Sequence, residues 1–230
     1  MDLIYTKKKT LNKKYICLIP ARAGSKRVPN KNLKNLNSKP LIKYSIDFAK
    51  NIFDNRDIYL TSDSKEALDI GKKSQINTHN RPKFLAQDNS SMLDATLNFI
   101  DFYNFSDDIN IVLLQPTNPF RDEAFYLKLK SLFEQTKNAT SAISLIKCSF
   151  FHPSKIGEID SKNYFRKLQN ISPEENIDNH KKMAYYVISG TYYIVPIYVL
   201  KNLNSFIGNN PVGLAEDEAN FCNIDKPSDF

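Results

Sequence analysis

A loop rich in cations follows the first apolar segment of the chain (YICLIP, residues 15–20). Its four cations are Arg22, Lys26, Arg27 and Lys31. Gly24 would let the backbone approach a ligand closely, and Ser25 can donate a hydroxyl hydrogen bond. Guanidinium and ammonium groups can neutralise a triphosphate that would otherwise repel a nucleophile. The loop has neither a Walker A pattern nor G-x-G-x-x-G, and a solvated basic loop is the alternative interpretation.

The elements that must position this loop alternate between two patterns. Apolar runs typical of buried strands occupy residues 15–20, 57–61, 109–114, 139–146 and 185–198. Apolar residues at helical spacing occupy residues 40–53, 64–73, 91–103 and 123–135. This order predicts an α/β fold, with a mostly parallel twisted sheet and helices on both faces. Ligands bind such sheets beyond the carboxyl ends of the strands, which is where the cationic loop falls.

Composition limits the function classes. The 230 residues are 41% hydrophobic and carry a net charge of +7, which leaves a basic nucleic-acid-binding module open as a second class of function. Nucleic acid is a disfavoured partner, because the basic residues 1–14 form a tail without interleaved aromatic side chains. No run reaches membrane-spanning length and no signal peptide is evident, so we expect a cytoplasmic protein without a membrane partner. Cys17 lies within an apolar run, which favours a packed core thiol.

Four sequence motifs carry a resemblance to a known family. They read PARAGSKRVPNKN (20–32), NRPKFLAQD (80–88), LLQPTNPFR (113–121) and IDKPSDF (224–230). In order and spacing they resemble the acylneuraminate cytidylyltransferases (CMP-sialic acid synthetases), including bacterial legionaminic and pseudaminic acid variants. The resemblance implies a Rossmann-like nucleotidyltransferase fold that transfers CMP from CTP to the anomeric hydroxyl of a nonulosonic sugar acid and releases pyrophosphate. A Kdo-type or other sugar nucleotidyltransferase is the alternative among enzymes.

The resemblance also implies a role for individual residues. The nucleotide-binding positions are Arg22, Ser25, Lys26, Lys31, Asn32, Arg81 and Ser91. The substrate-binding positions are Gln115, Thr117, Lys155 and Tyr192. The catalytic positions are Arg22, Lys31 and Asp225. Ser91 could equally be the N-cap of the helix that follows it.

A magnesium (or manganese) site is implied near the C-terminus. The family ends its final strand with Asp-Ile-Asp-Thr-Pro, and this chain has Asn223-Ile224-Asp225-Lys226-Pro227 in its place. Positions two apart in a strand share a face, so the Asn223 amide and the Asp225 carboxylate can converge on one ion. Mg²⁺ completes its octahedron with water and phosphate oxygens, so few protein ligands suffice. Capping of the following helix by Asp225 is the alternative.

Three further positions depart from the family pattern. Asn118 stands where serine is commoner, and Ser189 stands where an asparagine precedes glycine. The region that offers a basic residue to the sugar carboxylate reads DNHKKM (178–183) and contains no arginine, which leaves Lys181 or Lys182 as candidates. The sequence therefore leaves the identity of the sugar acid open.

The chain is expected to form one domain over residues 15–230, interrupted by an arm. Residues of about 155–185 are polar and irregular, with short strand-like pieces at KIGEI and NYFRKL. The resemblance implies that this arm builds a homodimer and lies beside the partner's site. A long surface loop is the alternative.

Overall fold

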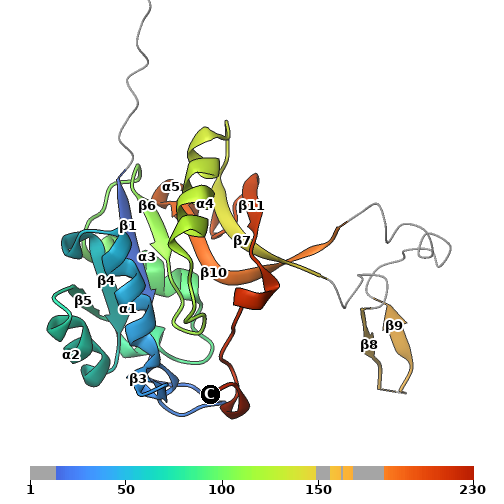
Figure 1. Cartoon of the computed structure of the whole chain (residues 1–230), viewed down its shortest axis with the longest axis horizontal. Helices are drawn as coiled ribbons and strands as arrows, with labels where there is room; N and C mark the ends of the chain where they lie inside the picture. The colour runs from blue at the N-terminus through green and yellow to red at the C-terminus, as the bar shows by residue number, and fades with distance from the viewer. Residues whose placement is uncertain (1–13, 149–155, 162, 168–183) are drawn as a thin grey trace, which may run out of the picture.

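The computed structural model describes residues 14–148, 156–161, 163–167 and 184–230. Its centre is a seven-stranded sheet with the order β11-β7-β10-β6-β1-β4-β5. The strands are β1 (Tyr15–Pro20), β4 (Ile58–Ser62), β5 (Asn77–Asn80), β6 (Asn110–Leu113), β7 (Ser141–Lys147), β10 (Tyr186–Pro196) and β11 (Pro211–Ala215). The strand β10 is antiparallel to both of its neighbours, and the other pairs are parallel. The predicted mostly parallel sheet is confirmed (Figure 1).

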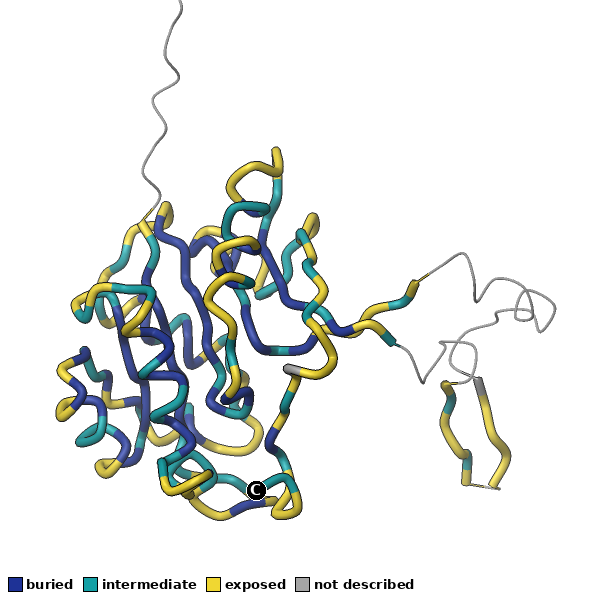
Figure 2. The backbone as a smooth tube through the Cα atoms, viewed as in Figure 1, coloured by how far each residue is buried: buried dark blue, intermediate teal, exposed yellow. Residues whose placement is uncertain are grey.

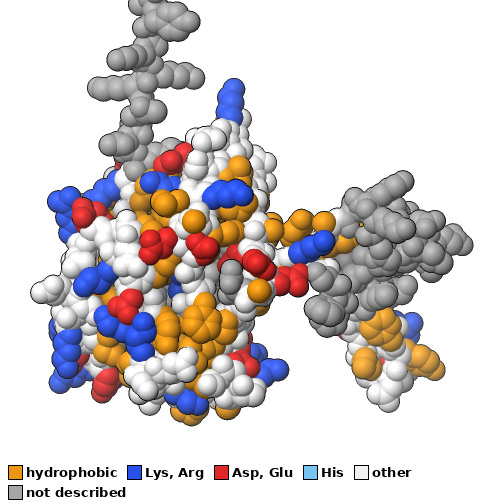
Figure 3. All heavy atoms as spheres, in the orientation of Figure 1, with side chains coloured by type: hydrophobic (Ala, Val, Ile, Leu, Met, Phe, Trp, Pro, Cys, Tyr) orange, Lys and Arg blue, Asp and Glu red, His pale blue; other side chains and the backbone are white. Residues whose placement is uncertain are grey.

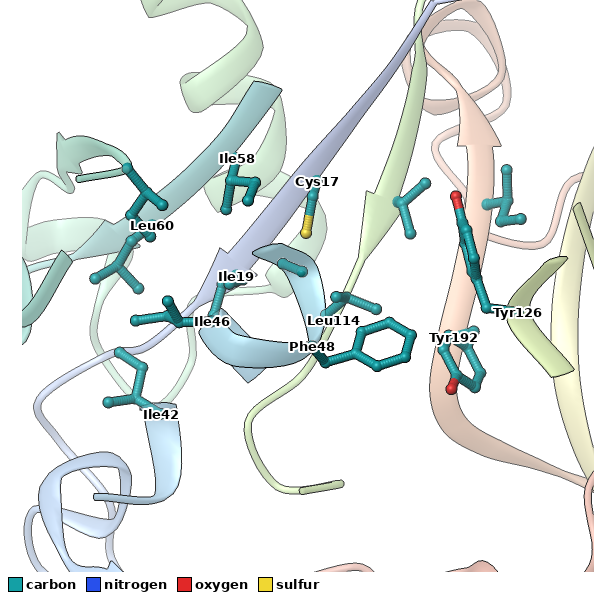
Figure 4. Close-up of a cluster of buried hydrophobic side chains, with 14 of the residues drawn as sticks. Cys17, Ile19, Ile42, Ile46, Phe48, Ile58, Leu60, Leu114, Tyr126 and Tyr192 are labelled. Carbon is teal, nitrogen blue, oxygen red and sulfur yellow. The ribbon is translucent and has the colours of Figure 1, made fainter. Parts of the chain in front are cut away.

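Helices cover both faces of the sheet, as the sequence predicts. They are α1 (Leu41–Ile52), α2 (Lys65–Lys73), α3 (Met92–Phe102), α4 (Glu123–Gln135) and α5 (Ile197–Leu203). Side chains of α1, α2 and α4 pack in one hydrophobic cluster with Cys17 and Ile19 of β1, drawn in Figure 4. Side chains of α3 and α5 pack in a second cluster with Ile16 and Leu18. Because side chains alternate along β1, each face of this strand fills one of the two cores.

Local sequence signals explain where the helices begin. The Ser64 hydroxyl accepts a hydrogen bond from the amide of Ala67, and the Asp122 carboxylate accepts from the first turn of α4. Each side chain satisfies a backbone donor that has no partner within its own helix. The amphipathic pattern then continues for the length of the helix, so the observed ranges of α1 to α4 differ from the expected ones by one residue at most at each end. The helix α5 was not predicted, because the apolar run expected at 185–198 extends into it.

The strand β10 contains the one irregularity that matters for the site. Its register with β7 shifts between Ile188 and Tyr193, and Gly190 has a positive φ of 80°. A side chain is strained in that conformation, so glycine suits the bulge. On the amino-terminal side of the bulge, β10 and the end of β7 project from the body of the molecule (Figures 1 and 2).

Part of the predicted arm is described. A two-stranded antiparallel sheet pairs β8 (Gly157–Ile159) with β9 (Phe165–Lys167), in agreement with the strand-like pieces expected there. Ile159 and Phe165 are 71% and 55% exposed. Hydrophobic side chains also gather on the projecting strands, where Tyr186, Val187 and Ile188 are exposed (Figure 3). Exposed hydrophobic side chains therefore occur on both the hairpin and the projecting strands.

Candidate active site

A cavity of about 140 Å³ opens at the carboxyl ends of β1, β5 and β6. Its lining includes seven of the sequence-predicted site residues, namely Arg22, Ser25, Lys31, Asn32, Arg81, Gln115 and Thr117. Pro20, Gly24, Met92 and Pro116 complete the lining. Residues from three separate motifs therefore meet at one edge of the sheet, which is the position expected for a ligand in an open α/β fold.

A second cavity adjoins the first through Arg22, Ser25 and Lys31, which line both. Its other lining residues are Lys26, Arg27, Asp88 and Asp225. The predicted nucleotide-binding Lys26 thus lies in this second cavity, with a side chain that is 76% exposed. The two adjoining cavities, together called the groove, share these three residues of the cationic loop.

The cationic loop is held from several sides. The Asn32 amide donates to the carbonyl of Arg22 at 3.0 Å, and the amide of Ala23 donates to Asp63 at 2.8 Å. The Arg22 guanidinium donates to the carbonyl of Gln87 at 3.0 Å and to the Asp88 carboxylate at 3.1 Å. These contacts fix the backbone of the loop before any ligand binds.

The predicted catalytic pair Lys31 and Asp225 is in direct contact. The Lys31 ammonium lies 2.8 Å from the Asp225 carboxylate and donates to the carbonyl of Ile224 at 3.0 Å. Arg27 reaches the second carboxylate oxygen at 3.1 Å. The hydrogen bond from Lys31 holds the pKa of Asp225 below its usual range, so the carboxylate is ionised at neutral pH.

Arg81 supplies a buried cation at the end of β5. Its side chain is 3% exposed, and it donates to the Thr61 carbonyl at 3.2 Å and the Thr61 hydroxyl at 3.4 Å. Burial lowers the pKa of Arg81 to about 10, so the group stays charged at neutral pH. The same Thr61 hydroxyl lies 2.9 Å from Nδ1 of His79. Thr61 thus fixes the orientation of the guanidinium that lines the cavity.

The segment 115–121 forms the opposite wall. Arg121 donates to the Gln115 carbonyl at 2.6 Å, to the Ser45 hydroxyl at 3.0 Å and to the Thr191 carbonyl at 3.3 Å. One guanidinium therefore ties the predicted sugar-facing loop to α1 and β10. Pro116 also restricts the backbone of this wall, which suits a rigid binding surface.

Asn118 joins this wall to two other segments. Its side chain is buried and donates to the carbonyls of Ser189 and Cys222 at 3.4 and 3.3 Å. The amide of Ile224 donates to the carbonyl of Thr117 at 2.8 Å. These bonds seat the C-terminal segment beside the cavity, and Asp225 reaches the cationic loop from there.

Two expectations about the C-terminal segment are wrong. Residues 221–226 form no strand, so strand geometry does not bring Asn223 and Asp225 to one face; the Asn223 side chain only contributes to the lowered pKa of Asp225. Asp225 also does not cap the turn that follows. The Asp229 carboxylate accepts hydrogen bonds from the amides of Asp225 and Lys226, at 2.8 and 2.7 Å.

Ser91, Tyr192 and the predicted metal ligand Asn223 line neither cavity. Ser91 is the N-cap of α3 and accepts from the amide of Asp94 at 2.9 Å, so the capping alternative is confirmed. Tyr192 is buried in the hydrophobic core, and its hydroxyl bonds the backbone of Asp122. Tyr192 therefore has a packing role in this structure. Lys155 lies outside the described residues.

Comparison with known proteins fixes the family. The family model described as cytidylyltransferase matches residues 16–196. The chain belongs to the cytidylyltransferase family. It is 27% identical over 219 residues to CMP-N,N'-diacetyllegionaminic acid synthase of Legionella pneumophila, covering 94% of this chain and 92% of that protein. It is 31% identical over 153 residues to N-acylneuraminate cytidylyltransferase of Streptococcus agalactiae serotype V, covering 66% of this chain and 36% of that protein.

A solved structure supports the fold of this cytidylyltransferase. CMP:2-keto-3-deoxy-manno-octonic acid synthetase complexed with CTP superposes with a TM-score of 0.67 over 94% of each chain, at 17% sequence identity. The N-acylneuraminate cytidylyltransferase of S. agalactiae is much longer than this chain, which matches little more than a third of it. The likeness to the solved structure therefore shows the fold alone.

The residues near Asp225 fit a weakly held divalent cation. Within the part of the chain that the structure describes, no group of three or more His, Cys, Asp or Glu side chains could hold a metal ion. Asp225 and Asn223 offer one carboxylate and one amide oxygen, and both are hard donors of the kind that Mg²⁺ takes. Lys31 and Arg27 already neutralise the carboxylate. The donor set thus suits an ion that arrives with substrate phosphates and its own water ligands.

Sequence reasoning missed several residues of the site. Asp88 and Arg27 lie in the motifs that carry the resemblance, but neither was named as a binding or catalytic residue. Their position next to named site residues was the sequence signal that could have identified them. Arg121 ends the third motif and was read only as part of the resemblance. Asp63 had no recognisable signal in the sequence, since its bond to Ala23 depends on the adjacency of β1 and β4.

Among the described residues, no helix is both long enough and apolar enough to cross a bilayer.

Proposed function

We propose that this cytidylyltransferase transfers CMP from CTP to the anomeric hydroxyl of a nonulosonic acid, with release of pyrophosphate. The observation that carries the proposal is the cavity at the carboxyl ends of the strands, in which Arg22, Lys31 and Arg81 face one groove. Relatives that match this chain are named for N-acylneuraminate and legionaminic acid. The names of these relatives indicate the class of acceptor, and the cations that line the groove favour a triphosphate as the donor.

The reaction requires positioning and charge neutralisation. The anomeric oxygen forms a bond to the α-phosphorus, the bond from that phosphorus to the bridging oxygen of the β-phosphate breaks, and pyrophosphate leaves with that electron pair. The hydroxyl proton passes to solvent. Arg22 and Lys31 line the first cavity and would neutralise the charge on the phosphates, and Lys26 in the second cavity would contact the leaving pyrophosphate. Such a step depends on alignment and electrostatic stabilisation rather than on a covalent enzyme intermediate.

Magnesium (or manganese) is part of the proposal. Asp225 and Asn223 would hold the ion, which would shield phosphate charge when bound. Lys31 contacts the same carboxylate at 2.8 Å, so Asp225 also fixes the position of this lysine. The chain's own contribution is to keep an ionised carboxylate and a cation together beside the groove.

The acceptor side of the groove is formed by Gln115 and Thr117. An amide and a hydroxyl can pair with sugar hydroxyls or with a carboxylate. Arg121 and the Asn118 amide both donate to the Gln115 carbonyl, and the Ile224 amide donates to the Thr117 carbonyl. Lys181 and Lys182 remain the candidates for the sugar carboxylate, and they lie outside the described residues, as does Lys155. Kdo remains the alternative acceptor.

We also propose a homodimer built by the arm. Its support is the exposed apolar surface of the described residues, which includes Ile159 and Phe165 of the hairpin and Val187 of the projecting strand. Exposed apolar surface of this extent is typical of a contact face.

A cytoplasmic location is expected because the proposed donor CTP is an intracellular nucleotide.

The test is a pyrophosphate-release assay with each of four NTPs against nine-carbon and eight-carbon sugar acids. We expect turnover with CTP and a nonulosonic acid, and a strong loss of kcat/KM in Arg22→Ala, because water does not replace a bidentate guanidinium. Turnover with Kdo alone would select the alternative acceptor. Absence of CTP turnover with every acid, combined with salt-sensitive RNA retention, would refute the proposal in favour of nucleic-acid binding.

A further inference from the structure

Each cation of the loop is paired with one of two aspartates. Arg22 and Lys26 both lie 3.1 Å from the Asp88 carboxylate, one on each oxygen. Arg27 and Lys31 contact Asp225 in the same two-to-one manner. Asp88 comes from the loop before α3 and Asp225 from the C-terminal segment, so the two carboxylates approach the loop from different parts of the chain. The net positive charge of the groove is therefore smaller than the four cations of the loop alone would give.

The Asp88 carboxylate bridges Arg22 and Lys26, two cations that the proposed function assigns to the phosphates. It lines the second cavity together with Arg22, Ser25 and Lys26, and its side chain is 42% exposed. A ligand phosphate that engaged Arg22 and Lys26 would meet this carboxylate at their shared contact point. Anionic oxygens compete for the same donors, and a triphosphate carries several times the charge of one carboxylate.

We propose that Asp88 is a competing anion that limits the affinity of the loop for the triphosphate of the nucleotide. The inference rests on the proposed function, since it takes the ligand to be a nucleoside triphosphate. When the triphosphate binds, Arg22 and Lys26 exchange the carboxylate for phosphate oxygens. The displaced Asp88 remains beside the ligand and repels it, which keeps binding reversible and favours release of the pyrophosphate product.

Two effects of Asp88 oppose each other, and the structure indicates which is larger. Asp88 could strengthen binding by holding Arg22 and Lys26 in place. Arg22, however, is also held by its bond to the Gln87 carbonyl, and the Asn32 amide fixes its backbone. Lys26 is 76% exposed, and an exposed ion pair orders such a side chain only weakly. Loss of the carboxylate therefore removes repulsion while most of the loop geometry remains.

The test compares two isosteric substitutions. Asp88→Asn removes the competing charge. The control is Asp47→Asn, because Asp47 also bridges two cations, Lys39 and Lys43, at 3.0 and 2.9 Å, and is 41% exposed. Asp47 lies on α1 outside both cavities of the groove. Both variants change the net charge by the same amount, so a difference between them reports on position alone.

Dissociation constants are measured by calorimetry with CTP and with inorganic triphosphate, in EDTA so that no metal contributes. We expect Asp88→Asn to bind both probes about threefold to tenfold more tightly than the wild type, as for a part-exposed charge pair. Asp47→Asn should change the dissociation constants less than about twofold. Unchanged or weaker binding of both probes by Asp88→Asn would overturn the inference, as would equal tightening in the two variants.

The two probes separate this inference from the proposed function. If inorganic triphosphate binds the wild type and tightens in Asp88→Asn while CTP does not bind at all, the loop inference stands and the proposed nucleotide is wrong. If CTP binds the wild type but Asp88→Asn weakens it, the proposed function stands and Asp88 is a supporting ligand instead. If neither probe binds any variant, both are overturned.

Discussion

Arg121 is the residue whose substitution tests most directly how the fold holds the site. Its guanidinium makes three bonds, to Gln115, Ser45 and Thr191, and these acceptors belong to the cavity wall, α1 and β10. In Arg121→Lys the charge is kept but the planar fork is lost. A single ammonium reaches fewer acceptors in fixed directions, so we expect at least one to lose its donor.

The magnitude follows from the burial of those acceptors. Ser45 and Thr191 are 0% and 1% exposed, so an acceptor that loses its donor there has no access to water. A hydrogen bond to a charged group contributes about 1.5–3 kcal/mol, and a buried unsatisfied acceptor costs about 1–3 kcal/mol. Arg121 itself borders a cavity and is only part-buried, so water can replace part of the lost hydrogen bonding. Arg121→Lys should therefore lower the free energy of unfolding by about 2–3 kcal/mol.

Urea unfolding followed by circular dichroism measures this loss, and steady-state kinetics measure its effect on the site. We expect the KM for the sugar acid to rise more than the KM for CTP, because the bond to the Gln115 carbonyl shapes the acceptor wall. The control is Arg56→Lys, a surface arginine that is 82% exposed. A change in unfolding free energy below about 0.5 kcal/mol, the range of ordinary surface substitutions, would refute the reasoning.

Three further predictions follow from the structure. Asp225→Asn should abolish most Mg²⁺-dependent turnover, and Asn223→Asp should lower the Mg²⁺ concentration needed for half-maximal rate; an unchanged Mg²⁺ titration in both variants would remove this pair from the metal site. Burial lowers the pKa of His79 below its unfolded value of 6.5, so the unfolded state binds the proton first and stability falls as the pH drops below about 6.5. Unfolding measured between pH 7 and pH 5 should show a smaller fall in His79→Gln, and an equal fall would contradict this linkage. Sedimentation at micromolar concentration should show a dimer, whereas a monomer would count against the proposal that the arm builds a homodimer.

The sequence by itself determined the central strands and most helices. The ranges of β1 and α4 were predicted to the residue, because an uninterrupted apolar run and a regular amphipathic stripe are local patterns that burial requires. The sequence also indicated which motifs supply the cavity. Parallel strands present their carboxyl ends at one edge, so the loops after β1 and β6 had to converge.

The two strands of the main sheet that were missed share a physical cause. The strands β5 and β11 were not predicted, and both lie at an edge of the sheet. β5 reads NTHN, and residues of β11 alternate between exposed and intermediate burial. An edge strand pairs on one side only and needs less apolar surface, so it carries little hydrophobic signal. The insertion of β10 between β6 and β7 was equally hidden, since strand order depends on pairing between distant segments.

Tertiary structure alone decided which charges meet. Lys31 and Asp225 are 194 positions apart, and their contact depends on Asn118 and Thr117 seating the C-terminal segment. Tyr192 and Tyr193 are neighbours in an aromatic run, yet one fills the first core and the other packs against the second. Local sequence specifies that side chains alternate along a strand, but the bulge at Gly190 sets which face each takes. A register is fixed only when the whole sheet packs.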